Sequence, residues 1–156
     1  MNIVIVAVGK LKEKFWLAAC EEYLKRLRPY AKLEVRELAD VDPGKAGGIH
    51  ASLAKEEEAI LAAIPERAYV FLLAIEGKMR SSEELSAHVD KLALSGKNDL
   101  TFVIGGSEGV SPAVKARADE TLSFGPITLP HNLARVVLLE QIYRVFKISR
   151  GEPYHK

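Results

Sequence analysis

Residues 100–132 read LTFVIGGSEGVSPAVKARADETLSFGPITLPHN, and this stretch decides the fold. Its first five residues, 100–104, carry no charge and are typical of a buried strand. Gly105 and two further glycines follow at once, and glycine lets a ligand approach the backbone closely. Ser111 and Pro112 then predict the start of a helix, because a hydroxyl caps the first turn and proline suits the first helical position.

A second turn follows a short strand that we predict at residues 121–124. Gly125 and Pro126 break that strand, residues 127–129 extend, and a further proline turns the chain before a long helix. Two glycine-bearing turns, each leaving the end of a strand, build a nucleotide-sized pocket at the carboxyl edge of an α/β sheet. We expect both turns to meet Leu73, at the end of another buried strand, at that edge.

Outside this stretch the chain alternates between predicted strands and predicted helices. The strands are residues 2–8, 33–38 and 68–75, and the helices are residues 15–27, 52–64, 81–94 and 132–150. This order is typical of one α/β domain, with a mostly parallel sheet flanked by helices on both faces. Residues 39–51, rich in Asp, Pro and Gly, are predicted to form a mobile surface loop, and residues 76–78 a turn.

Composition excludes several classes of protein. No apolar run approaches the roughly 18 residues of a membrane span, and the N-terminus lacks the features of a signal peptide. The single cysteine, Cys20, leaves no internal disulfide, so we expect a cytoplasmic protein. Net charge is +1, but basic side chains outnumber acidic ones by eight to four in residues 10–36 and by five to two in residues 130–156. Both ends are candidates for contact with phosphate.

The predicted helix at residues 132–150 is apolar on more than one face, which exceeds what a single core contact needs. We therefore expect part of it to pack on a second subunit. Four polar or basic side chains recur along it at three-residue steps: Gln141, Arg144, Lys147 and Arg150. That spacing fits an ordinary hydrated face as well as a binding role. The polar tail at residues 151–156 would acquire a function only if it reached the pocket.

The catalytic motifs of several enzyme classes are absent from the sequence. No G-x-G-x-x-G follows the first predicted strand, which disfavours a dinucleotide oxidoreductase. The chain also has no P-loop, no HExxH and no CxxC, and we expect no metal. Two classes remain: an enzyme that binds and orients an already activated cofactor, or a non-catalytic module that binds nucleic acid or nucleotides.

Four motifs occur in order along the chain: FVIGGSEGVSP, SFGPITLPH, RVVLLEQIYRVFKISRG and EPYHK. Together they resemble the ribosomal large-subunit methyltransferase H family, and the resemblance covers the whole chain. That family belongs to the SPOUT superfamily of knotted methyltransferases and methylates N3 of a pseudouridine in 23S rRNA. The resemblance implies a single SPOUT domain over residues 1–156, a trefoil knot in its C-terminal half and a homodimer.

The resemblance also implies that S-adenosylmethionine binds in a bent shape. The cofactor contacts map to Leu73, Gly105, Phe124, Gly125, Pro126, Ile127, Thr128 and Leu129. This set agrees with the pocket expected from the two turns. Adenine would lie in an apolar slot and bond to backbone groups.

The substrate implied by the resemblance is 23S rRNA in the assembled ribosome rather than DNA or a small molecule. Near-zero net charge argues against strong binding to naked RNA, which needs many phosphate contacts. The ribosome's shape would then supply the rest of the recognition. The alternative is a non-catalytic ribosome- or nucleotide-binding α/β module.

Catalysis in such an enzyme requires N3 of pseudouridine to lose a proton, because the sulfonium already makes the methyl group electrophilic. With the resemblance, we favour a tail that folds over the cofactor. His155 is a candidate base, since histidine titrates near neutral pH, and Tyr154 is a candidate for stacking on the base or bonding to it. Arg144 and Arg135 are candidates to hold phosphate or the developing anion. Glu108, in the glycine turn, is a second candidate base.

Overall fold

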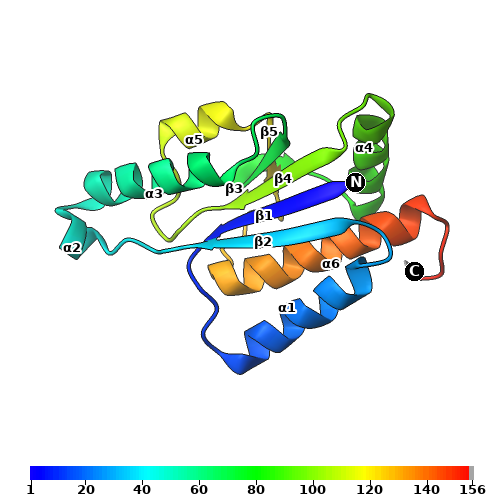
Figure 1. The fold of residues 1–156 in the computed structure, drawn as a ribbon, viewed down its shortest axis with the longest axis horizontal. Helices are drawn as coiled ribbons and strands as arrows, with labels where there is room; N and C mark the ends of the chain where they lie inside the picture. The colour runs from blue at the N-terminus through cyan, green and yellow to red at the C-terminus, as the bar shows by residue number, and fades with distance from the viewer. Residues whose placement is uncertain (155–156) are drawn as a thin grey trace.

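The computed structural model of the protein describes residues 1–154. This part of the chain forms a five-stranded parallel sheet in the order β2-β1-β4-β3-β5, with helices on both faces (Figure 1). The strands are β1 (Asn2–Val8), β2 (Lys32–Leu38), β3 (Tyr69–Met79), β4 (Asp99–Ile104) and β5 (Glu120–Ser123). The helices are α1 (Lys14–Leu27), α2 (Pro43–Ala46), α3 (Ile49–Ala63), α4 (Ser82–Leu94), α5 (Pro112–Arg117) and α6 (His131–Ser149). The predicted α/β class is confirmed.

Strand β1 shows why both faces of the sheet are covered. Successive side chains of a strand point to opposite faces, so its unbroken aliphatic sequence feeds two cores. Ile3 and Ile5 enter the core beneath α1, α4 and α6. Val4 and Val6 enter the core beneath α3 and α5. This double burial fits the interior position of β1, between β2 and β4.

Two predicted helix caps are confirmed. The Ser111 hydroxyl accepts a bond from the Val114 N–H at 3.3 Å, so α5 begins directly after the glycine turn. Ser81 and Glu84 form the predicted capping box at the start of α4, with bonds of 3.1 and 2.7 Å. These caps are local, which is why the sequence reveals them.

Residues 39–51 are not the mobile loop that their composition predicts. They contain α2 and the first turn of α3, which begins at Ile49. Two buried side chains of α3 bind the backbone of Val41: the Glu56 carboxylate accepts its N–H at 3.0 Å, and the Ser52 hydroxyl donates to its carbonyl at 2.7 Å. The prediction was wrong because turn-forming residues also cap helices.

Strand β3 continues through residues 76–78, which the sequence predicts as a turn. Its register against β5 shifts there, because both Leu73 and Lys78 lie opposite Leu122. Gly77 allows the backbones of β3 and β5 to lie close together there, because a Cβ at that position would lie 2.8 Å from the carbonyl carbon of Leu122. The glycine marks a contact between two backbones rather than a reversal of the chain. The trefoil knot in this half of the chain stays a prediction.

Helix α6 lies between α1 and α4 on one face of the sheet (Figure 1). It buries Leu138, Leu139, Ile142 and Val145. Part of the apolar surface that led us to expect a second subunit is therefore used within the chain, and the homodimer stays a prediction. Among residues 1–154 no helix has the length and apolarity needed to span a membrane.

Candidate functional site

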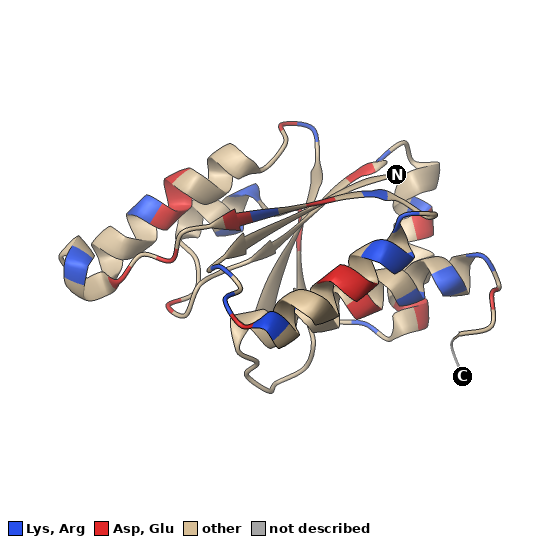
Figure 2. Ribbon diagram, turned by 60° about the horizontal axis from the view of Figure 1, so that its bottom comes forward, with Lys and Arg blue, Asp and Glu red and all other residues tan. Residues whose placement is uncertain are grey.

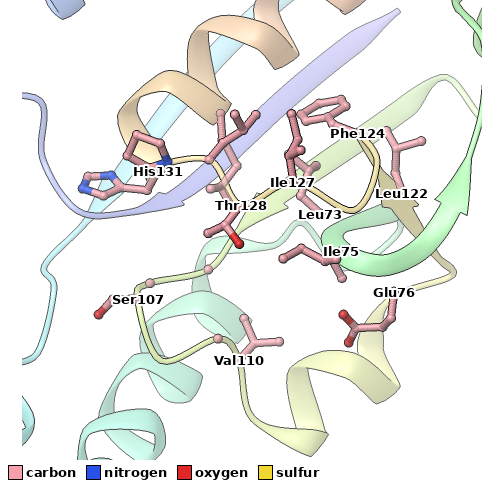
Figure 3. A pocket seen from close by; sticks show the side chains of 18 of the residues that line it. Leu73, Ile75, Glu76, Ser107, Val110, Leu122, Phe124, Ile127, Thr128 and His131 are labelled. Carbon is pink, nitrogen blue, oxygen red and sulfur yellow. The ribbon is translucent and has the colours of Figure 1, made fainter.

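A pocket of about 800 Å³ opens at the carboxyl edge of the sheet (Figure 3). Its walls come mainly from three segments: the part of β3 at residues 73–76, the glycine turn at residues 104–110, and parts of the connection at residues 122–131, with Lys115 and Ala134 adding to the lining. These are the three segments that the sequence predicts to meet at this edge. The volume is within the range of pockets that hold small-molecule cofactors.

Most of the predicted cofactor residues line this pocket. They are Leu73, Gly105, Phe124, Gly125, Ile127, Thr128 and Leu129. Pro126 belongs to the same loop but does not contribute to the pocket wall. Figure 3 shows Leu73, Phe124 and Ile127 gathered on one side of the pocket, with Thr128 beside them. The wall on that side is apolar, which suits a flat heterocycle.

The glycine turn forms the opposite wall. Gly106 and Gly109 pair across it, with the Gly109 N–H donating to the Gly106 carbonyl at 3.1 Å. A Cβ on Gly105 would lie 2.6 Å from Cγ1 of Val110 and 3.0 Å from the Gly109 carbonyl oxygen. Glycine at position 105 is therefore required by the turn itself, and the turn presents backbone rather than side chains to a ligand.

His131 is a pocket residue to which our sequence analysis assigned no role. It is the first residue of α6, and its ring packs against Gly9: a Cβ there would lie 2.6 Å from its Cε1 atom. Its Nδ1 atom is buried and has no hydrogen-bond partner among residues 1–154. The signal in the sequence was a histidine directly after the proline that ends the pocket loop, at the start of a helix.

Glu108 lies on the glycine turn, where it is exposed and contributes to the pocket wall. Behind the same turn lies Glu56, only 4% exposed, with a carboxylate oxygen 3.2 Å from where a Cβ on Gly106 would stand. Burial raises the pKa of Glu56, and the hydrogen bond from the Val41 N–H opposes that shift only in part. No group of His, Cys, Asp and Glu within residues 1–154 is arranged to hold a metal ion.

Arg135 is absent from the pocket wall, although the sequence made it a candidate site residue. Its guanidinium is 2% exposed, bonds to the Glu37 carboxylate at 2.6 Å and donates to the Gly9 carbonyl at 2.8 Å. Burial alone would raise the pKa of Glu37, but the bonds from Arg135 and from the Leu11 N–H hold it below its usual value. The structure thus shows Arg135 connecting α6 to β1 and β2.

Tyr154 and Arg144 are brought together, on the far part of α6. The Tyr154 hydroxyl donates to Glu140 at 2.9 Å, and Arg144 bonds the other oxygen of that carboxylate at 2.7 Å. The guanidinium carbon of Arg144 lies 4.8 Å from the Tyr154 ring centroid. Tyr23 also bonds to Glu140. Burial is the main cause that raises the pKa of Tyr23 to about 12, and the bond to Glu140 is the second cause. His155, the other tail candidate, lies outside the described residues.

The cluster of Tyr154, Arg144 and Glu140 lies away from the pocket of the same chain. The pocket contains His131 at the start of α6, and Arg144 lies thirteen residues further on. At 1.5 Å per residue the two are about 20 Å apart along the helix. Figure 1 shows α6 running from the carboxyl edge of the sheet towards the end where both termini lie. None of the described tail residues lines its own chain's pocket.

The predicted basic stripe of α6 is largely engaged in internal contacts. Lys147 pairs with Glu152 at 2.5 Å, and the guanidinium carbon of Arg150 lies 4.5 Å from the ring centroid of Tyr30. Gln141 accepts a bond from Ser82 at 2.7 Å. Figure 2 shows basic and acidic residues interspersed along the helices rather than separated on different faces.

Comparison with known proteins identifies the family of this chain. Residues 1–155 match a family model described as "Predicted SPOUT methyltransferase". A relative from Listeria monocytogenes serovar 1/2a is 55% identical over 159 residues, one from Limosilactobacillus fermentum is 53% identical and one from Enterococcus faecalis is 52% identical. Each alignment covers 100% of both chains, and each relative is named "Ribosomal RNA large subunit methyltransferase H". The chain therefore belongs to the SPOUT methyltransferases, in the family of the ribosomal RNA large subunit methyltransferases H.

Proposed function

We propose that the protein transfers the methyl group of S-adenosylmethionine to N3 of a pseudouridine in 23S rRNA, within the assembled ribosome. The observation that carries the proposal is the pocket, whose wall includes every predicted cofactor residue except Pro126. Family membership supports the same reaction, because a methyltransferase needs a methyl donor. We also propose that the protein acts in the cytoplasm as a homodimer.

The pocket residues fit this cofactor chemically. The apolar side chains of Leu73, Phe124 and Ile127 suit the faces of adenine, and the glycine turn at Gly105 leaves backbone polar groups free to approach its edge. Thr128 adds a hydroxyl for a polar part of the ligand. When bound, the sulfonium of the cofactor supplies an electrophilic methyl group, so the protein's own tasks are orientation, exclusion of water and removal of a proton.

Proton removal from N3 is the chemical step left to the side chains. We propose His155 and Tyr154 as the residues that act on the pseudouridine, with Arg144 beside Tyr154 as the cation that favours the anion. Because no described tail residue lines its own chain's pocket, a second subunit would have to bring its tail to that pocket. Glu108, on the pocket wall, is the second candidate base. Arg135 is left out, since Glu37 occupies its guanidinium.

Labelled methyl transfer tests this proposal. Whole ribosomes or large subunits should accept the methyl group, and free rRNA should not. Deleting residues 154–156 should remove most of the transfer while leaving dimerisation and cofactor binding largely intact. A truncated protein that methylates at the wild-type rate would exclude the tail and leave Glu108 as the base to test. Methylation of free rRNA as fast as of ribosomes would contradict the proposed substrate.

The second candidate function is a ribosome-binding factor without chemistry, which the interspersed charges and the near-zero net charge also allow. The two functions differ in one measurement, since a binding factor transfers no labelled methyl group. Calorimetry separates both from a dinucleotide enzyme, because the methyltransferase should bind S-adenosylmethionine and not NAD.

A further inference from the structure

Ser123 ends β5 at the rim of the pocket, and its side chain is buried at 4% exposure. Its hydroxyl donates to the carbonyl of Ile75 at 2.8 Å and accepts the N–H of Gly125 at 3.1 Å. The carbonyl of Gly125 lies farther away, at 3.3 Å, and competes for the same single proton. Both hydrogen-bonding capacities of the hydroxyl are thus used, one on each of two separate chain segments.

Both partners of Ser123 belong to the pocket wall. Ile75 lies in the part of β3 between Leu73 and Lys78, where the register against β5 shifts. No regular pairing with β5 holds this segment, and the Ser123 hydroxyl supplies the hydrogen-bond donor for the Ile75 carbonyl. Gly125 has φ of +106° and starts the loop that contributes most of the predicted cofactor contacts. The hydroxyl therefore connects two walls that belong to different strands.

A second buried serine shows what a purely structural hydroxyl looks like in this fold. Ser86 in α4 is 1% exposed and donates to the Val145 carbonyl at 2.9 Å. The bond is similar in length to that of Ser123, and both serine side chains are buried. Neither Ser86 nor Val145 belongs to the pocket wall. The pair offers a comparison of the same chemical change at the pocket and away from it.

We propose that Ser123 is a positioning residue for the cofactor, holding Ile75 and the start of the 124–129 loop at the spacing that the ligand requires. The inference rests on the proposed function of the pocket as the S-adenosylmethionine site. The hydroxyl does not itself line the pocket, so it acts through the two backbone segments. Without it, the Ile75 carbonyl and the Gly125 N–H lose a shared partner, and the loop gains conformations that binding has to suppress.

Calorimetry with S-adenosylmethionine tests the inference on the full-length protein and three variants. Ser123→Ala should weaken cofactor affinity about tenfold, the cost of one or two lost hydrogen bonds. Ser123→Thr keeps the hydroxyl in a residue that suits a strand and should restore most of the affinity. Ser86→Ala should lower the melting temperature by about as much as Ser123→Ala does, and it should leave cofactor affinity within about twofold of the wild type. In methyl transfer, Ser123→Ala should raise KM for the cofactor much more than it lowers kcat.

The outcomes separate this inference from the proposed function. Wild-type protein that fails to bind S-adenosylmethionine would overturn both. Wild-type binding, together with a folded Ser123→Ala variant of unchanged affinity, would overturn the inference alone. Equal losses of affinity in Ser123→Ala and Ser86→Ala would also overturn it, because the effect would then be one of general stability. Should Ser123→Ala not fold, Ser123→Cys keeps a weak donor of similar shape and should show an intermediate loss of affinity.

Discussion

Arg135 is the largest fully buried side chain in residues 1–154, and its charge is paired. The guanidinium satisfies the Glu37 carboxylate and the Gly9 carbonyl, and Gly9 in turn packs against the pocket residue His131. A buried ion pair adds little net stability, but removing one partner leaves the other uncompensated. Arg135 therefore affects the pocket through the backbone that it holds.

Replacing Arg135 by methionine should destabilise the fold by about 3 kcal/mol, near the lower end for a broken buried pair, because Glu37 is still 32% exposed to water. Urea unfolding measures this loss. Arg26→Met is the matched control, since it removes an Arg–Glu pair whose side chains are both more than 40% exposed. The control should unfold at the wild-type urea concentration. Equal midpoints for both variants would contradict the buried pairing.

Glu56 gives the protein a stability that depends on pH. Burial raises the pKa of its carboxyl above the usual value of 4.5, so the folded state binds this proton more tightly than the unfolded chain does. The associated stabilisation is complete below the unfolded pKa and is lost as pH rises through the folded pKa. The charged carboxylate therefore costs stability on the alkaline side of that window.

Glu56→Gln should raise the melting temperature at pH 8 and flatten its dependence on pH from about 4.5 upwards. Glutamine keeps an oxygen that can accept the Val41 N–H. Ser52→Ala is the control, because it removes the neighbouring bond to the Val41 carbonyl without changing a titrating group. It should lower the melting temperature by a similar amount at every pH. A Glu56→Gln variant less stable than the wild type at pH 8 would refute this account.

At the scale of elements, the contact between β3 and β5 shapes the pocket. The register shift between Leu73 and Lys78 releases the residues between them from regular pairing, and three of these residues contribute to the pocket wall. At Gly77 the backbone of β5 leaves no room for a side chain, since the nitrogen and the carbonyl carbon of Leu122 would lie 2.9 and 2.8 Å from an added Cβ. These atoms belong to the backbone of β5, which cannot rotate aside as the end of a flexible side chain can.

Gly77→Ala should consequently destabilise the fold by roughly 2–3 kcal/mol, the cost of overpacking a rigid site. It should also weaken cofactor binding, since the neighbouring residues form the pocket wall. Gly44→Ala is the control: its added Cβ would meet only a side-chain oxygen of Asp42, at 3.2 Å. Thermal unfolding of the two variants checks the prediction. Similar melting temperatures for both variants would mean that β5 can shift to make room for the added methyl group with little loss of stability.

At the scale of the whole molecule, α6 joins two halves of the proposed site that lie far apart. The pocket includes His131 at the start of the helix, and Arg144, which packs on Tyr154, lies about 20 Å further along it. A symmetric dimer can bring one chain's tail to the other chain's pocket, because a two-fold axis places each subunit's surface against the same surface of its partner. The assembly prediction and the catalytic prediction are therefore linked.

Mixing two inactive variants tests this arrangement. One protein lacks residues 154–156, and the other carries Gly105→Val, which obstructs the glycine turn. Random exchange of subunits should restore roughly a quarter of wild-type methyl transfer, since half the dimers are mixed and each mixed dimer contains one complete site. Light scattering on the wild type should give twice 17.2 kDa. A 17.2 kDa species, or no recovery on mixing, would contradict a site shared between subunits.

The sequence by itself determined the class of fold, both serine caps and the three segments that meet at the pocket. Each of these features depends on residues that lie close together in the sequence. The aliphatic run of β1 needs two buried faces, Ser81 and Ser111 stand directly before their helices, and glycine follows β4 at once. Parallel strands that alternate with helices place their carboxyl ends along one edge, so the site of the pocket follows from order along the chain.

Only the tertiary structure decided which distant groups meet. Arg135 binds Glu37 across 98 positions of sequence, and Ser123 binds Ile75 across 48. The sequence EGK at residues 76–78 indicates a turn, yet its glycine serves a backbone contact with β5. Hydrophobic period and capping act within a few residues, whereas a buried hydrogen bond depends on which backbone the packed core brings within 3 Å. That placement results from packing the whole chain, and no short stretch of sequence encodes it.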